Sequence, residues 1–325
     1  MIFVYLLLIL IFSFFLIKAT DILVINLKNI SQRTKVGQYA ITTVLLAFAT
    51  SLPELTVALV AAVNKESNLV LGNIIGSNIA NLSLVIGMAS LIGGSVVVKG
   101  EFLKRDVFYA FLAGSAPMLL LFDKNLSRLD GVILIILYGF YNITILRKRQ
   151  KELAEARDGK DGGFIHGLID KFNHKGVKKD LAWIFLGVAL LLFSADIIVK
   201  SAMAIAQGFN IPVFLIGLFL VSAGTTLPEF AFSLKAIKSH QPKMVFGDLL
   251  GSIVANGTFI VGIAAIVSPI RIVAFEKYLL ATFAFVVLFG LFYFFIKTKH
   301  KLQRWEGALL VFAYLVFVIL ELLKA

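Results

Sequence analysis

Long apolar runs alternate along this chain with short polar stretches that carry most of the charged residues. An apolar run of about 20 residues is long enough to cross a bilayer as an α-helix. Each of the ten runs bounded by charge is therefore predicted to be a helix. The predicted helices cover residues 2–27, 37–63, 69–94, 105–122, 129–146, 181–207, 211–238, 244–267, 278–296 and 305–323. This pattern predicts an all-α polytopic membrane protein with ten transmembrane helices.

The composition of the chain agrees with this pattern and excludes a soluble domain. Hydrophobic residues make up 59% of the sequence and charged residues 15%, whereas a soluble domain has about 45–50% and about 25% respectively. The first apolar run lacks both a basic start and a small-residue cleavage site. We therefore expect it to be retained as a helix rather than removed as a signal peptide.

Residue types that support enzymatic chemistry are scarce in this sequence. The chain has no cysteine, which excludes disulfides, thiol catalysis and thiolate metal sites. All four histidines lie in polar connections, and neither the zinc-protease motif HExxH nor the phosphate-binding motif GxxxxGK occurs. The apolar segments also lack a credible pair of nucleophile and base. We therefore expect neither an enzyme nor a bound cofactor.

Two sequence motifs occur twice at a constant separation of 175 residues. The motif TSLPE at 50–54 recurs as TTLPE at 225–229, and GNIIGSNIAN at 72–81 recurs as GDLLGSIVAN at 247–256. The segments around these motifs align without gaps, with 15 identities in 53 positions. Self-similarity of this kind indicates duplicated structural units.

The duplication divides the chain into two halves of five predicted helices each. The first half covers residues 1–146 and the second 181–325, and the polar loop 147–180 joins them. Because five is an odd number, the second half must enter the membrane from the opposite side. We therefore predict inverted repeats related by a pseudo-two-fold axis in the membrane plane, an arrangement typical of secondary transporters.

The distribution of basic residues predicts the orientation. With both termini outside, the inner connections hold 23 Lys and Arg residues, whereas the outer connections and the C-terminus hold 6. Loops with an excess of Lys and Arg remain on the cytoplasmic side. We therefore expect a protein of the cell membrane, with both termini outside and the loop 147–180 in the cytoplasm.

Two glutamates stand inside apolar segments, where charged residues are rare. Glu54 and Glu229 occupy equivalent positions in the two halves, and they directly follow Pro53 and Pro228. A carboxylate in the middle of a bilayer costs at least about 2.5–3.5 kcal/mol, and the motif segments contain no Lys or Arg at comparable depth. The partner of each carboxylate is therefore expected to be a mobile cation or a proton. The prolines are expected to break the helices and to free carbonyl oxygens beside the carboxylates.

The second motif adds side-chain oxygen atoms to this region. Ser77 and Asn81 are four residues apart and so share one helix face, as do Ser252 and Asn256. The complete set contains carboxylate, hydroxyl, amide and carbonyl oxygen, but no sulfur or imidazole. Such oxygens suit Ca²⁺, which takes about 6–8 oxygen ligands, and the neutral ones suit Na⁺. The duplicated set therefore predicts a site for hard cations, although each element alone is also compatible with helix packing.

The motifs TSLPEL with GNIIGSNIAN, and TTLPEF with GDLLGSIVAN, resemble the paired α-repeats of the cation/calcium exchanger superfamily, in particular the prokaryotic-type sodium/calcium exchangers. This resemblance extends over essentially the whole chain and implies secondary active antiport of Na⁺ and Ca²⁺ by alternating access. It implies that Glu54, Glu229 and the carbonyls of Thr50 and Thr225 bind Ca²⁺. For Na⁺ it implies positions built from Ala47, Ser51, Ser77, Ser222, Thr225, Thr226, Ser252 and the two glutamates. The same resemblance implies that Asn81 and Asn256 line the site.

The sequence also leaves alternatives open. Asp248 stands where the family usually has Asn, and the equivalent position in the first half is Asn73. Asn256 stands where potassium-dependent relatives carry Asp, which argues against K⁺ co-transport. An H⁺/Ca²⁺ antiporter is the main alternative, but the many hydroxyls favour Na⁺. A cation channel is less favoured, because an inverted repeat within one chain is typical of a carrier. We expect contact with membrane lipid, no nucleic acid and no protein partner.

Overall fold

The computed structural model describes residues 2–34, 50–94, 96–97, 102–156, 175–238, 242–299 and 301–323, and this part of the chain is almost entirely helical. The elements of the first half are α1 (Ile2–Thr34), α3 (Leu52–Val63), α4 (Ser67–Ala80), η1 (Asn81–Val85), α5 (Ile86–Gly93), β1 (Val96–Val97), α6 (Phe102–Leu120), η2 (Leu121–Asp123), β2 (Asn125–Leu126) and α7 (Arg128–Ala156). Those of the second half are α9 (Lys175–Phe209), α10 (Val213–Leu215), η3 (Ile216–Val221), α11 (Ser222–Thr225), α12 (Leu227–Lys238), α13 (Pro242–Val254), η4 (Ala255–Ile260), α14 (Val261–Val267), β3 (Ile270–Arg271), α15 (Phe275–Lys299), β4 (Lys301–Leu302) and α16 (Arg304–Leu323).

Within these described ranges, seven helical stretches are long and apolar enough to cross a membrane. They are Phe3–Asn26, Ser67–Gly93, Lys179–Phe209, Val213–Lys238, Met244–Val267, Phe275–Lys297 and Arg304–Leu323. Two shorter apolar helices, Leu52–Val63 and Val107–Asp123, accompany them. The prediction of a helical membrane protein with several spans is confirmed.

Several helices are longer than the apolar runs that predicted them. Helix α1 continues to Thr34 rather than ending at residue 27, α7 continues to Ala156, and α9 already begins at Lys175. The joining loop predicted for 147–180 is therefore partly helical at both ends. An apolar run marks the part of a helix that can lie in lipid, whereas backbone hydrogen bonding continues into the polar flanks. Residues 37–49 of the second predicted helix lie outside the described residues.

The continuous stretch α4–η1–α5 occupies the centre of the molecule. In its most apolar part, 94% of the residues are buried, compared with 28% for the peripheral α16. Gly72 and Gly76 allow this close packing, because a Cβ atom at either position would overlap a carbonyl oxygen of the neighbouring α10–η3 stretch. The glycines therefore bring the backbones of the two halves into direct contact.

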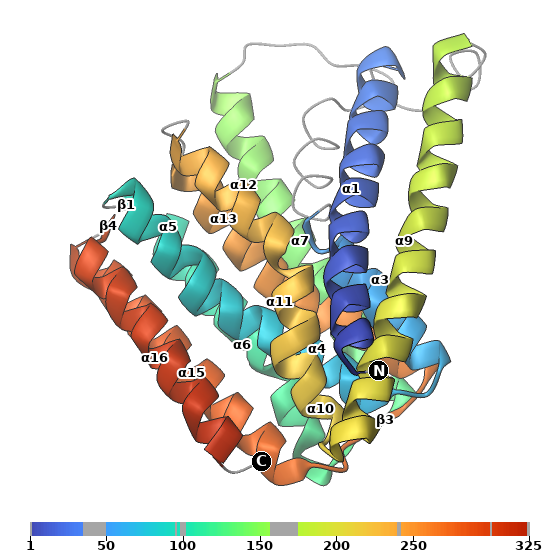
Figure 1. Cartoon of the computed structure of the whole chain (residues 1–325). Coiled ribbons are helices and arrows are strands. Elements are labelled where there is room, and N and C mark those ends of the chain that lie inside the picture. The colour runs from blue at the N-terminus through green and yellow to red at the C-terminus, as the bar shows by residue number, and fades with distance from the viewer. Residues whose placement is uncertain are drawn as a thin grey trace.

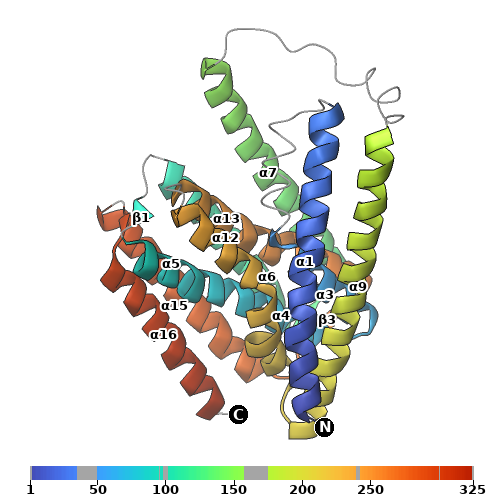
Figure 2. The same cartoon turned by 45° about the horizontal axis from the view of Figure 1, so that its top comes forward.

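Helices α1 and α9 form a long antiparallel pair at one side of the bundle (Figure 1). They remain side by side after the molecule is turned, as Figure 2 shows. Many side chains on this pair are exposed, including those of Phe3, Phe14, Phe185 and Phe193. An exposed apolar surface of this kind is suited to lipid rather than water. The first helices of the two halves thus lie together and run in opposite directions.

Two short antiparallel ribbons were not predicted from the sequence. Strand β1 pairs with β4, and β2 pairs with β3. In the sequence repeat, β3 is the counterpart of β1, and β4 is the counterpart of β2. Each ribbon therefore pairs one strand from each half, and the strands of one ribbon are the repeat counterparts of the strands of the other. Each ribbon also joins two connections that the charge pattern assigns to the same side of the membrane.

Reciprocal packing also connects the third and fifth helices of opposite halves. A Cβ atom on Gly87 would lie 2.8 Å from the carbonyl oxygen of Gly307, and one on Gly262 would lie 2.8 Å from that of Gly131. These glycines are counterparts in the repeat. Each close approach holds the fifth helix of one half against the third helix of the other.

The acidic residue that opens each fifth helix has a capping role. Asp130 accepts a hydrogen bond from the backbone N–H of Ser127 at 2.8 Å, and Glu306 accepts one from that of Gln303 at 2.7 Å. These contacts satisfy backbone donors at a helix start. An acidic residue followed by glycine occurs at the start of both fifth helices, as Asp130–Gly131 and Glu306–Gly307. The acid caps the helix, and the glycine allows close helix packing.

Candidate ion-binding site

Two buried glutamates lie in the first turns of the helices that begin within the TSLPE and TTLPE motifs. Glu54 belongs to α3 and Glu229 to α12, and their side chains are 0% and 1% exposed. Neither carboxylate forms an ion pair with a Lys or Arg among the described residues. One oxygen of Glu54 and both oxygens of Glu229 also lack a hydrogen-bond partner in that part of the chain. Because buried charge requires compensation, these oxygens are suited to bind a cation.

The helical backbone is interrupted at one residue, three positions before each glutamate, in agreement with the break expected from the prolines. Ser51 separates Thr50 from α3, and Thr226 separates α11 from α12. Hydrogen bonds bridge the second interruption, since Thr226 N–H donates to Ser222 and Phe230 N–H donates to Thr226. The interruption therefore leaves the two segments roughly continuous while it places each glutamate in a first helical turn. There the carboxylate benefits from the positive end of the helix dipole.

Hydroxyls from the proline motifs contact the second motif of the opposite half. The Thr50 hydroxyl donates to Asp248 Oδ1 at 2.9 Å, and the Thr225 hydroxyl donates to Asn73 Oδ1 at 3.1 Å. Both threonines are counterparts in the repeat, as are their acceptors. The site is therefore assembled from both halves of the chain.

Serine hydroxyls from the second motifs contact the same groups. Ser77 Oγ donates to Glu54 Oε1 at 3.4 Å and lies 3.3 Å from Thr225 Oγ1. In the equivalent place, Ser252 Oγ lies 3.5 Å from Thr50 Oγ1 and accepts from Ser51 at 3.3 Å. Long hydroxyl–hydroxyl distances indicate weak bonds, so these oxygens remain available to coordinate a cation.

Two other predicted sodium ligands, Ser222 and Thr226, donate their hydroxyl protons to backbone carbonyls. Ser222 donates to the Leu218 carbonyl at 2.5 Å, and Thr226 donates to the Ser222 carbonyl at 2.6 Å. Each hydroxyl therefore uses its proton within its own helix and keeps lone pairs that can accept a cation. Ala47 lies outside the described residues.

The two asparagines predicted to line the site are fully buried. Neither amide atom of Asn81 has a hydrogen-bond partner among the described residues, and Asn256 Oδ1 also lacks one there. Asn256 Nδ2 donates to Asn78 Oδ1 at 3.0 Å. Asn81 is the first residue of the π-helical stretch η1, and Asn256 is the second residue of η4. Such stretches are frequent at functional sites.

Some members of this cluster were missed or left open by the sequence analysis. Asn73 and Asp248 accept the cross-half hydrogen bonds, and Asn78 accepts one from Asn256. The repeat itself singles out Asn73 and Asp248, because a polar residue stands at both equivalent positions. It gives no signal for Asn78, whose counterpart is Ile253.

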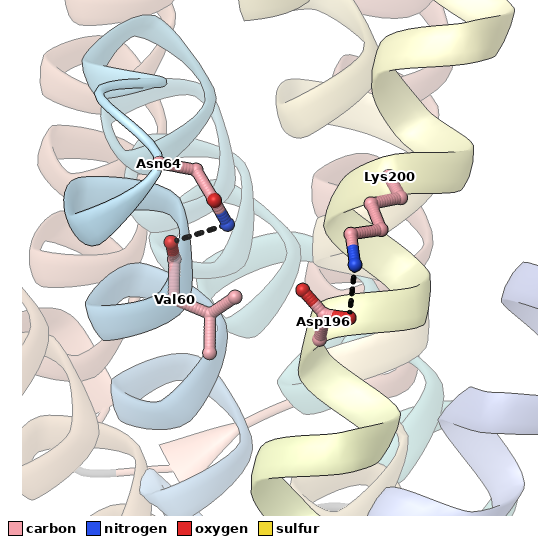
Figure 3. Close-up of polar contacts among 4 residues, drawn as sticks. All are labelled: Val60, Asn64, Asp196 and Lys200. Atoms are coloured by element: carbon pink, nitrogen blue, oxygen red, sulfur yellow. Dashed lines mark hydrogen bonds and ion pairs between the residues drawn. The ribbon is translucent and has the colours of Figure 1, made fainter.

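The acidic residues of the first helices do not belong to the hydrogen-bonded cluster. Asp196 forms an ion pair with Lys200 on the same helix at 2.7 Å, and both side chains are substantially exposed (Figure 3). The view also shows Asn64, whose side chain donates to the Val60 carbonyl at the end of α3, which packs against α9. Asp21 on α1 is likewise exposed.

No group of three or more His, Cys, Asp or Glu side chains in the described part of the chain could hold a metal ion. The cluster instead combines carboxylates with neutral hydroxyl and amide oxygens. This arrangement suits a hard ion that binds through several neutral ligands and can be released.

Comparison with known proteins places these features in a family. The sequence profile of the sodium/calcium exchanger protein family matches residues 4–147 and 179–323. The chain is 26% identical to the sodium/calcium exchanger MaX1 of Methanosarcina acetivorans over 94% of this chain and 95% of that protein. It is 29% identical to an uncharacterized membrane protein of Methanocaldococcus jannaschii over 92% of each chain. A structure of the sodium-calcium exchanger NCX_Mj soaked with Na⁺ and Ca²⁺ superimposes with a TM-score of 0.60 and 26% identity, covering 97% of this chain and 96% of that one.

Proposed function

The chain belongs to the sodium/calcium exchanger family, and from this membership we propose that it exchanges Na⁺ for Ca²⁺ across the cell membrane by alternating access. The main support for this proposal is the pair of buried carboxylates, Glu54 and Glu229. Among the described residues, neither forms an ion pair with Lys or Arg, and three of their four oxygens have no hydrogen-bond partner. An empty pair of glutamates is costly to keep in a low-dielectric interior. A transported cation supplies the missing charge.

In the proposed site, Glu54 and Glu229 bind Ca²⁺ together with the backbone carbonyls of Thr50 and Thr225. Na⁺ ions occupy positions that share the glutamates and use the neutral oxygens around them. The residues proposed for Na⁺ are Ala47, Ser51, Ser77, Ser222, Thr225, Thr226 and Ser252. Asn81 and Asn256 line the centre. The weak hydroxyl contacts of Ser77, Thr225 and Ser252 support this role, because such contacts are easily replaced by contacts to an ion.

The proposed architecture has ten spans in two inverted repeats. Residues 1–146 form one repeat, 181–325 form the other, and 147–180 form a cytoplasmic linker. The antiparallel α1–α9 pair, the exchanged ribbons and the reciprocal glycine contacts support this arrangement. An inverted repeat allows the same central site to open to either side of the membrane in turn.

The alternating cycle follows from the charge of the site. The two ionised glutamates favour a filled site, because moving uncompensated charge through a low dielectric is costly. The protein therefore changes access with cargo bound and does so slowly when empty. Because the site changes access only with an ion bound, Na⁺ moving down its gradient drives Ca²⁺ in the opposite direction.

The driving ion is tested by measuring ⁴⁵Ca²⁺ uptake into proteoliposomes under separate outward gradients of Na⁺, H⁺, K⁺ and Li⁺. We expect rapid uptake with Na⁺ and only background uptake with H⁺ or K⁺. Uptake driven by H⁺ alone would favour an H⁺/Ca²⁺ antiporter. Equal uptake in every condition would indicate a channel and contradict the proposal.

The orientation is tested by cysteine labelling, for which the chain is suited because it contains no native cysteine. Val273 lies in an exposed connection proposed to be outside, and Lys297 lies near an end proposed to be inside. In intact cells, a membrane-impermeant maleimide should label Val273→Cys, whereas Lys297→Cys should react only after permeabilisation. The reverse pattern would contradict termini outside the cell.

A further inference from the structure

A hydrogen bond between two buried asparagines connects the second motifs of the two halves. Asn256 Nδ2 on η4 donates to Asn78 Oδ1 on α4 at 3.0 Å, and these side chains are 0% and 2% exposed. Asn78 directly follows Ser77, and Asn256 lies about one helical turn after Ser252. Both serines contact residues of the TSLPE or TTLPE motif. The amide pair is therefore adjacent to the proposed ion site.

This hydrogen bond determines which atom of Asn256 remains available. The nitrogen and the oxygen of an amide diverge from the same carbon, so an amide held through Nδ2 presents Oδ1 in another direction. Asn256 Oδ1 is buried and has no hydrogen-bond partner among the described residues. A buried amide oxygen without a donor is costly. A bound cation removes this cost, since amide oxygens are ligands for hard cations.

The other half has no equivalent of this contact between the described residues. The repeat counterpart of Asn256 is Asn81, and that of Asn78 is Ile253, whose buried side chain offers no acceptor. In the described part of the chain, neither amide atom of Asn81 has a hydrogen-bond partner. The neighbouring side chain thus orients the amide of Asn256 but not that of Asn81.

Resting on the proposed exchange of Na⁺ for Ca²⁺, we propose that Asn78 is a positioning residue that holds the Asn256 amide with Oδ1 toward the transported Na⁺. A ligand that is already oriented in the empty site binds more tightly than one that must be ordered on binding. The effect is larger for Na⁺ than for Ca²⁺, since Na⁺ depends on neutral oxygens, whereas the two glutamates supply most of the attraction for Ca²⁺.

The test is the Na⁺ dependence of ⁴⁵Ca²⁺ exchange by Asn78→Leu in proteoliposomes. Leucine is branched at the same carbon as asparagine, so the variant keeps the shape and loses the acceptor. We expect the KM for Na⁺ to rise about threefold to tenfold, the range for one net hydrogen bond. The KM for Ca²⁺ and the maximal rate should change by less than about twofold. A lower maximal rate with an unchanged KM for Na⁺ would overturn the proposal.

The matched control for this substitution is Asn142→Leu. The Asn142 side chain donates to the Tyr138 carbonyl within α7 at 2.9 Å, so its loss does not reach the site. We expect wild-type KM values for both ions. An equal rise in the KM for Na⁺ in this control would overturn the proposal, because the effect of Asn78→Leu would then not depend on Asn256.

The double variant Asn78→Leu/Asn256→Leu tests whether Asn78 acts through Asn256. Each single variant should raise the KM for Na⁺, and the double variant should resemble Asn256→Leu, because no amide is then left to orient. Two residues that act independently would instead give additive losses. Additive losses would overturn the positioning role.

A crystal structure of the wild-type protein with Na⁺ gives an answer even if no variant folds. We expect an ion in contact with Asn256 Oδ1 while Nδ2 still donates to Asn78. An Asn256 Oδ1 that accepts from a protein group and contacts no ion would overturn the positioning role and leave the exchange itself intact. A wild-type protein without Na⁺-dependent Ca²⁺ uptake would instead contradict the proposed function.

Discussion

Replacing either Glu54 or Glu229 by glutamine should abolish Na⁺-dependent Ca²⁺ transport. Each substitution removes one of the two charges that bind the divalent ion, while the side chain keeps nearly the same volume. Charged ligands contribute strongly in a buried site, where hydrogen bonds and ion contacts are poorly screened. A loss of about 3 kcal/mol, typical of one partner in a buried charge pair, corresponds to a fall of more than about 100-fold in apparent affinity.

The readout is ⁴⁵Ca²⁺ uptake driven by a Na⁺ gradient, with purified variants reconstituted at equal density. The matched control is Glu66→Gln, since Glu66 lies in the connection before α4 and makes no side-chain cap to that helix. We expect normal uptake from this control. Both site variants should remain folded, because neutralising an uncompensated buried charge removes a cost. Normal Ca²⁺ transport by both single variants would exclude the assignment of the site.

Substituting Gly76 by alanine should have the largest effect on stability. A Cβ atom at this position would overlap the Leu218 carbonyl and would lie 2.6 Å from Ser222 Oγ. The obstacle is backbone on a packed neighbouring helix, so no side-chain rotation can relieve it. Overpacking typically costs about 1–3 kcal/mol, and a clash between two central backbones lies at the upper end. The two motif helices must separate, which also displaces the site oxygens.

Thermal unfolding of the purified protein in detergent measures this effect. Gly76→Ala should lower Tm by roughly 4 °C for a loss of about 3 kcal/mol, since the unfolding entropy is about 2.1 cal/mol/K per residue and the chain has 325 residues. Gly290→Ala is the matched control, because Gly290 is exposed on α15 and has nothing within 4 Å of an added Cβ. An unchanged Tm for Gly76→Ala would show that the close approach of the two helices is not required.

The sequence predicted most of the helices because apolar runs in a membrane protein are long and directly visible. It misplaced the ends of α7 and α9, since polar residues such as those after 146 can continue a helix beyond the lipid. It could not predict the ribbons β1–β4 and β2–β3, whose two-residue strands are too short to carry an alternating pattern.

The candidate site was accessible from the sequence because its residues occur twice. Duplication pointed to Glu54 and Glu229 and to the polar residues around them. The pairing of Thr50 with Asp248, and of Thr225 with Asn73, depends on contact between the two halves and was not apparent from either motif alone. The π-helical turns at Asn81 and Asn256 likewise depend on a shift in backbone hydrogen bonding that leaves no compositional mark.

Obligatory coupling between the two ions tests the central claim most directly. Proteoliposomes loaded with ²²Na⁺ are placed in medium with ⁴⁵Ca²⁺, and both fluxes are followed in the same sample. We expect Ca²⁺ to accumulate against its own gradient while Na⁺ leaves in a fixed ratio, and both fluxes to stop when either ion is removed. Ca²⁺ entry that proceeds only down its gradient and without Na⁺ release would contradict exchange.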